Sequence, residues 1–194
     1  MENLKTILYN FDELKGESQE KFINLLQKKE LKKSDKIVNI GEVAENFFLL
    51  TKGVVRSYFT HKNGKEHTRT IYTPFTTTGA LSSLILKKPS DLDYECLTDC
   101  ELFYGNFHDF RKLTSKDIHF ANQYSKILEK ILLRIESRVF DLSVLNATQR
   151  YLKLKKDIPD IENLIAQYHI ASYLNITPIQ LSRIRKEIIE KRLY

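Results

Sequence analysis

The longest helical pattern in this sequence covers residues 115–145, which contain neither proline nor glycine. Apolar residues recur there at alternating intervals of four and three, the spacing of the contact seam of a coiled coil. This seam consists of Leu128, Leu132, Ile135, Val139 and Leu142. A second apolar stripe faces another direction and consists of Tyr124, Ile127 and Ile131. A helix that is apolar on two sides needs two partners, so we predict that the first seam makes a homodimer. The alternative is that both stripes pack on the chain's own folded domain.

The sequence ahead of this helix, between residues 37 and 110, is typical of short β-strands. Segments rich in β-branched and aromatic residues occur at 47–50, 54–59, 68–72, 94–97 and 101–104. Asn63-Gly64 stands between two of these segments and indicates a tight hairpin, because both residues tolerate a positive φ. Many short strands separated by turns favour a β-roll or jelly roll. Cys96 and Cys100 fall in this region, and we interpret them as core thiols.

A short amphipathic helix is predicted before the strands, at residues 17–29. The lysine-rich stretch 28–33 follows its apolar residues, and we interpret this stretch as the solvated end of the helix.

After residue 146 the pattern changes to short helices, at 148–155, 167–174 and 177–192. The segment 167–186, QYHIASYLNITPIQLSRIRK, has the pattern of a helix-turn-helix. Ala171 is small where two such helices cross, and Asn175 tolerates the left-handed backbone that the turn requires. Thr177 and Gln180 stand at capping-box positions around Pro178, which suits the first turn of a helix.

The second helix of this pair has one apolar face and one polar face. At 100° per residue, Leu181, Ile184 and Ile188 point inward. The candidate DNA-reading residues belong to the other faces and the helix start: Thr177, Pro178, Ile179, Gln180, Ser182, Arg183 and Lys186. An arginine such as Arg183 can bind a guanine edge with two hydrogen bonds, and Ile179 can contact a thymine methyl group.

The chain carries a net charge of +6, which is compatible with a polyanionic partner. We therefore predict binding to double-stranded DNA. The alternatives are a helical hairpin with a solvated basic face and a module that binds protein instead of DNA.

A β-rich domain, a long helix and a C-terminal helix-turn-helix, in this order, resemble the Crp/Fnr regulators. Lys52-Gly53 resembles a turn of that family, and Thr148-Gln149-Arg150 resembles the start of its first DNA-domain helix. The resemblance implies an α+β fold in three parts. These are a β-roll sensor-like domain at 1–113, a dimerisation helix at 114–146 and a helix-turn-helix domain at 147–194 with its β-wing absent or truncated.

The same resemblance implies a bacterial transcription regulator, and a cytoplasmic location is expected because the sequence starts with polar residues and has only two cysteines. Such a protein acts as a homodimer on a near-palindromic operator and contacts RNA polymerase.

The sequence departs from the family at its cyclic-nucleotide cassette. Family members that bind cyclic nucleotides carry a Gly-Glu pair and a later Arg-Ser or Arg-Thr. Here Gly79 is followed by Ala80, and the phosphate position falls at Ser90-Asp91. We therefore predict that cyclic AMP does not bind in the usual manner and that the effector is unknown. The expected effector pocket comprises Gly79, Ala80, Leu81, Ser90, Asp91 and Ile135.

The main enzyme alternative is a cupin-like metalloenzyme, because cupins also have a β-roll. The five histidines, His61, His67, His108, His119 and His169, lack the clustered spacing of such a metal site. We therefore expect no enzyme activity, no metal and no cofactor. No apolar run is long enough for a membrane span, so no membrane partner is expected.

Overall fold

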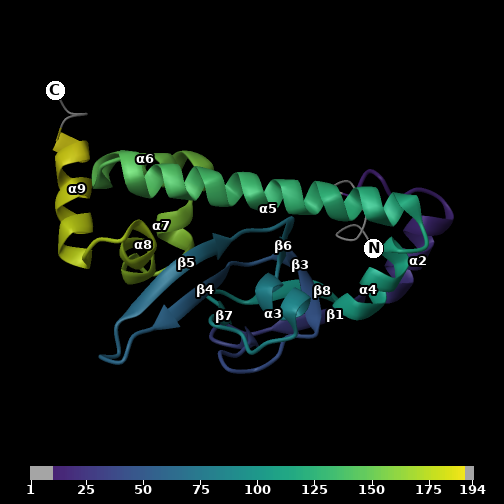
Figure 1. Ribbon diagram of the computed structural model, residues 1–194. Coiled ribbons are helices and arrows are strands. Elements are labelled where there is room, and N and C mark those ends of the chain that lie inside the picture. Colours follow the sequence, from purple (N-terminus) through teal and green to yellow (C-terminus); the bar gives the residue numbers. More distant parts are fainter. Residues whose placement is uncertain (1–10, 191–194) are drawn as a thin grey trace.

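The computed structural model describes residues 11–190, and within them the strands form a β-roll of two antiparallel sheets (Figure 1). One sheet has the strand order β1-β8-β3-β6 and the other the order β2-β7-β4-β5. The strands are β1 (Gln27–Leu31), β2 (Lys36–Val38), β3 (Asn46–Lys52), β4 (Val55–Thr60), β5 (Glu66–Tyr72), β6 (Thr76–Thr78), β7 (Asp93–Cys96) and β8 (Cys100–Asn106). The predicted core thiols are both buried in this roll, and so are Leu50 and Leu102.

The predicted hairpin is confirmed between β4 and β5. The amide of His61 donates to the carbonyl of Lys65 at 2.9 Å, and Gly64 has a φ of 80°. The two strands pair antiparallel from Thr60 opposite Glu66 back to Val55 opposite Tyr72.

The prediction of a helix through residue 29 is wrong at its end. Helix α2 (Glu17–Leu25) stops four residues earlier, and the lysine-rich stretch begins in β1. β1 pairs with β8 from Gln27 opposite Tyr104 to Leu31 opposite Cys100. Lys and Glu have a low intrinsic preference for β-strands, but the backbone hydrogen bonds to β8 outweigh it. The charged side chains are left exposed at the edge of the sheet.

Helix α5 (Ile118–Val144) is the long helix that the pattern predicted, and it runs along one side of the β-roll (Figure 1). The preceding α4 (Phe107–Thr114) is a separate helix, because Asp117 caps α5 by accepting a hydrogen bond from the amide of His119. Phe120 packs against Phe22 of α2 and Phe110 of α4, with ring centroids 5.9–6.3 Å apart. Phe47 of β3 contacts the rings of Phe22 and Phe110 and so links the start of α5 to the roll.

The second apolar stripe of α5 faces the β-roll. Tyr124 and Ile127 are partly buried against the aromatic cluster around Phe22. One of the two partners that the pattern required is therefore the chain's own domain.

The C-terminal helices pack around one small core that also includes residues of the β-roll. They are α6 (Ala147–Asp157), α7 (Ile161–Leu164), α8 (Gln167–Leu174) and α9 (Pro178–Glu190). Ile170, Leu174 and Leu181 are fully buried in this core, together with Val54 and Leu97 of the roll. The head formed by α6–α9 is thus docked on the roll. The predicted absence of a β-wing concerns the chain after α9, which lies outside the described residues.

Candidate functional site

The turn between α8 and α9 has the backbone that the sequence predicted. Asn175 adopts the left-handed conformation, with φ 56° and ψ 45°. The amide of Ile176 donates to the carbonyl of Ala171 at 3.0 Å, and the Ala171 side chain is fully buried where the helices meet. A larger side chain at this position would push the two helices apart.

The start of α9 is held by the predicted capping box. The amide of Gln180 donates to Oγ1 of Thr177 at 3.2 Å, and the amide of Thr177 donates to Oε1 of Gln180 at 2.9 Å. Two backbone donors that a helix start leaves unpaired are therefore satisfied by side chains.

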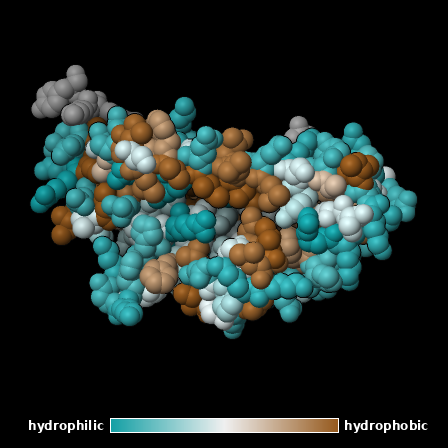
Figure 2. All heavy atoms as spheres, viewed as in Figure 1, coloured by the Kyte–Doolittle hydropathy of each residue, from teal (hydrophilic) through white to brown (hydrophobic). Residues whose placement is uncertain are grey.

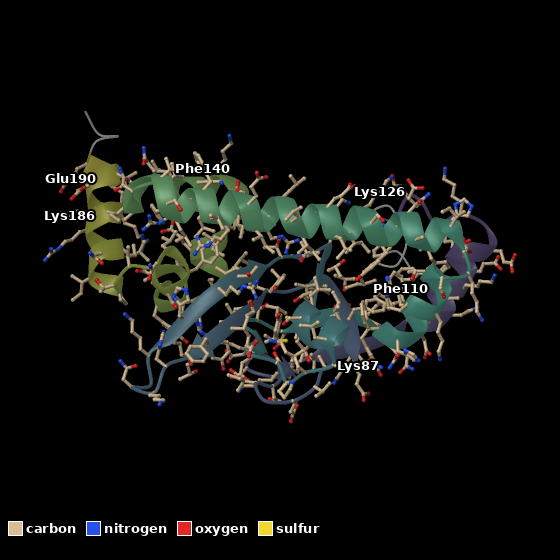
Figure 3. The ribbon with its side chains drawn as sticks, viewed as in Figure 1. Lys87, Phe110, Lys126, Phe140, Lys186 and Glu190 are labelled. Carbon is tan, nitrogen blue, oxygen red and sulfur yellow. The ribbon has the colours of Figure 1, made fainter. Side chains whose placement is uncertain are left out.

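The outer face of α9 carries the candidate DNA-reading residues. Leu181 and Ile184 are buried beneath it, whereas Ile179 is 67% exposed. The seven candidates are all exposed: Thr177, Pro178, Ile179, Gln180, Ser182, Arg183 and Lys186. In Figure 3 Lys186 points away from the rest of the molecule. None of the ion pairs among residues 11–190 involves Arg183, so its guanidinium is available to a ligand.

Arg185, on the flank of α9, has a structural contact instead. Its Nε lies 2.7 Å from Oε1 of Glu162, which also accepts from the hydroxyl of Tyr151 and pairs with Lys155. Burial raises the pKa of Glu162, but the hydrogen bonds from Lys155 and Tyr151 and the charge of Arg185 outweigh it and lower the pKa overall. This network ties α9 to α6 and α7.

Helix α8 is bonded directly to strand β5. The amide of Thr68 donates to Oγ of Ser172 at 2.9 Å, and this hydroxyl donates to the carbonyl of Glu66 at 3.0 Å. Next to this contact His169 is buried, and its Nδ1 has no hydrogen-bond partner. Burial and the charges of Arg56 and Lys33 lower the pKa of His169 to about 4.

Two arginines hold the far end of α8. Arg150 donates from Nε and Nη2 to the carbonyl of Leu174, at 3.3 and 3.2 Å. Arg138 of α5 donates to the carbonyl of Tyr173 and lies 4.0 Å from the centre of its ring. Arg150 belongs to the segment that resembles the family, whereas no motif in the sequence indicated a role for Arg138.

The predicted dimer seam of α5 forms an exposed apolar stripe. Leu132, Ile135, Val139 and Leu142 are 65%, 44%, 59% and 42% exposed, and Leu128 is half-buried. Leu133, Phe140 and Val144, which the sequence analysis did not include, are exposed beside them. Figure 2 shows hydrophobic side chains gathered over the middle of α5, and in Figure 3 Phe140 lies on the side away from the β-roll.

A cavity of about 460 Å³ lies between the β-roll, helix α3 (Leu81–Leu86) and α5. All six residues of the expected effector pocket line it: Gly79, Ala80, Leu81, Ser90, Asp91 and Ile135. The hydroxyl of Ser90 donates a hydrogen bond to the carbonyl of Leu92 at 2.7 Å, and the exposed Asp91 forms an ion pair with Lys88 at 3.2 Å. The cassette position therefore offers a carboxylate where a cyclic nucleotide requires a cation.

The cations of this cavity lie outside the predicted effector pocket. Arg69 of β5 and Arg134 of α5 both line the cavity, together with Tyr72 and Tyr94. Arg134 follows Ile127 and Ile131 at helical spacing, so its position on the face of α5 that contacts the roll could have been predicted. No sequence pattern predicts that Arg69 lines the cavity, because only the closure of the roll brings β5 next to it.

The described residues contain no group of three or more His, Cys, Asp or Glu side chains arranged to hold a metal ion. The metalloenzyme alternative therefore gains no support from them. None of the helices in this part of the chain combines the length and apolarity that a membrane span requires.

The β-roll is similar to a known domain family. Residues 28–117, which include most of the roll, match the cyclic nucleotide-binding domain family. With the long helix and the helix-turn-helix attached, the chain has the fold of the Crp/Fnr regulators, which confirms the resemblance seen in the sequence. No match was found among curated proteins.

Three solved structures illustrate this similarity. FixK2 from Bradyrhizobium japonicum is 18% identical with a TM-score of 0.73, and the match covers 86% of this chain and 85% of that one. The c-di-GMP responsive global regulator CLP from Xanthomonas campestris is 15% identical with a TM-score of 0.70, over 90% and 91% of the two chains. The catabolite activator protein of Thermus thermophilus is 21% identical with a TM-score of 0.57, over 94% and 87%.

Proposed function

We propose that this chain is a sequence-specific DNA-binding transcription regulator that acts as a homodimer. The observation that carries the proposal is the outer face of α9, where Ile179, Ser182, Arg183 and Lys186 are exposed together above a fully packed core. This face combines the short polar Ser182 with the branched apolar Ile179 and two cations, a set of side chains that fits the base edges in a major groove. We propose all seven candidate residues of the α9 start and outer face as the DNA contact.

The exposed stripe of α5 supports the homodimer. A contiguous row of large apolar side chains on a protein surface marks an interaction site, and the spacing of this row is that of a helix pair. Two copies joined here would present two copies of α9, which must lie about 34 Å apart to enter successive major grooves. The expected operator is therefore near-palindromic. The family resemblance adds an expected contact with RNA polymerase in a bacterial cytoplasm.

Cyclic AMP is not the expected effector. The ribose-binding carboxylate is replaced by buried Ala80, and the Arg-Ser position falls near Ser90-Asp91, which supplies a carboxylate and no cation. Loss of a bidentate, charge-assisted contact to a phosphate removes a large part of the affinity for such a ligand.

The test is selection of bound duplexes from a random pool by the purified chain without added ligand. Recovery of a two-fold symmetric sequence is the expected result. Binding to the selected duplex should fall steeply between low and moderate salt, because several phosphates release counterions. A pool without enrichment, together with duplex binding that does not depend on salt, would favour the alternative that the chain is a module that binds protein instead of DNA.

A further inference from the structure

We infer that the cavity between the β-roll and α5 binds a small organic carboxylate with an apolar body, an inference whose regulatory meaning rests on the proposed function. The volume of about 460 Å³ lies within the roughly 300–1,000 Å³ of small-molecule sites. Most of its wall is apolar, with Phe47, Leu49, Leu84, Phe110, Ile127 and Ile131 among the lining side chains. Such a wall accepts a hydrocarbon or aromatic body and leaves the polar edge of a nucleobase without partners.

One part of the cavity wall is cationic. The guanidinium of Arg134 lies 5.7 Å from the centre of the Tyr72 ring, which is stacked 6.1 Å from the ring of Tyr94. Arg69 lines the cavity together with both rings, and its charge lowers the pKa of Tyr94 against the larger effect of burial. Both arginines are thus placed around the same pair of tyrosine rings. None of the ion pairs among the described residues includes Arg69 or Arg134, whereas the carboxylate of Asp91 on the same cavity wall is paired with Lys88.

The two tyrosines complete a site for an anion. Burial raises the pKa of Tyr94 far above its ordinary value, so its phenol stays protonated at neutral pH. A protonated phenol can donate a hydrogen bond, and a guanidinium can bind both oxygens of a carboxylate. The ligand is therefore expected to place its carboxylate near Arg69 and Arg134 and its body among the apolar residues of the roll and α5.

The cavity also touches both surfaces that the proposed function uses. Leu128 and Ile135 line it and belong to the dimer seam of α5. On β5, Arg69 lines the cavity while the neighbouring Thr68 is bonded to Ser172 of the head. A ligand held by Arg69 and Arg134 would therefore act on the dimer helix and on the strand that holds the head.

The experiment is isothermal titration calorimetry of the full chain with two probes, octanoate and 4-phenylbutyrate. Octan-1-ol and cyclic AMP serve as comparisons, because the first lacks the charge and the second lacks the apolar body. The variants are Arg69→Gln and Arg134→Gln, with Lys116→Gln as the control for loss of an exposed positive charge outside the cavity. Thermal melting of each variant verifies that it is folded.

Saturable binding of at least one carboxylate is expected, with octan-1-ol weaker. Each arginine substitution should weaken that binding roughly tenfold, the effect of one charged hydrogen bond, and Lys116→Gln should leave it unchanged. The inference is overturned if neither carboxylate binds, if octan-1-ol binds as well, if the arginine variants bind normally or if cyclic AMP binds more tightly. Because the titration contains no DNA, its failure is distinct from a failure of the duplex selection.

Discussion

The hydroxyl of Ser172 in α8 lies 2.9 Å from the amide nitrogen of Thr68 in β5, and this bond fastens the helix-turn-helix head to the β-roll. A buried backbone donor that loses its acceptor is costly, because neither water nor another group replaces the bond.

Replacing Ser172 with Ala should loosen the docking of the head. It removes the acceptor of the Thr68 amide and the donor to Glu66, so we expect a loss of about 1–3 kcal/mol in the stability of this contact. Hydrogen exchange of the Thr68 amide measures it directly. Ser125→Ala, which removes only a local bond to the carbonyl of Ala121, is the control. Equal exchange of Thr68 in both variants would mean that the bond does not hold the head.

The pH dependence of stability should contain a contribution from His169. Because its pKa is lowered from 6.5 to about 4 in the folded chain, the folded state favours the neutral imidazole, whereas the unfolded state takes up a proton near pH 6.5. The contribution is therefore complete above pH 6.5 and is lost as the pH falls towards 4. Arg56 and Lys33 oppose the added charge, while Glu66 and Glu95 pair with Arg56.

Urea denaturation at pH 7 and pH 5 tests this expectation. The chain should lose about 2 kcal/mol through His169 alone, and His169→Gln should lack that part of the loss. The same pH dependence in both proteins would assign the effect to other groups.

Replacing Arg183 with Ala should weaken binding to the selected duplex by about 1–3 kcal/mol and relax specificity at one base pair. Arg185→Ala is the informative comparison on the same helix, because Arg185 is bound to Glu162. That variant should lower the unfolding free energy, whereas Arg183→Ala should not. Equal loss of affinity for selected and random duplex would show that Arg183 contacts phosphate only.

The homodimer is tested by Leu132→Asp. A carboxylate in the centre of the apolar stripe would have to be desolvated in the dimer, so the sedimentation mass should fall to that of one chain. Leu152→Asp is the control, since Leu152 is also an exposed leucine but belongs to α6, outside the predicted seam. A dimer mass retained by Leu132→Asp would contradict the assignment of the interface.

Gly53 should be sensitive to the smallest substitution. It has a φ of 91°, and an added Cβ would lie 2.4 Å from the carbonyl oxygen of Asp99 and 2.6 Å from Sγ of Cys100. Gly53→Ala should therefore cost about 3 kcal/mol or more of unfolding free energy. Gly64→Ala has open space around its Cβ at a φ of 80°, so only about 1 kcal/mol is expected. Thermal or urea unfolding that ranks the two variants equally would refute the steric argument.

The helix-turn-helix could be predicted residue by residue because its determinants are local. The left-handed Asn175, the Thr177–Gln180 capping box and the small Ala171 act within a few residues of one another. The hairpin at Gly64 follows the same logic. The apolar stripe of α5 could also be predicted, although the exposed surface is wider than a two-position repeat and includes Leu133 and Phe140.

The sequence by itself determined the order of strands, long helix and helix-turn-helix, because periodicity and turn chemistry operate over short stretches of chain. Only the tertiary structure decided that residues 27–31 form a strand, since that depends on pairing with β8. It also decided that Arg69 and Arg134 share one cavity and that Ser172 meets Thr68. These contacts join residues far apart in the chain, and only closure of the β-roll and packing of α5 and the head against it bring them together.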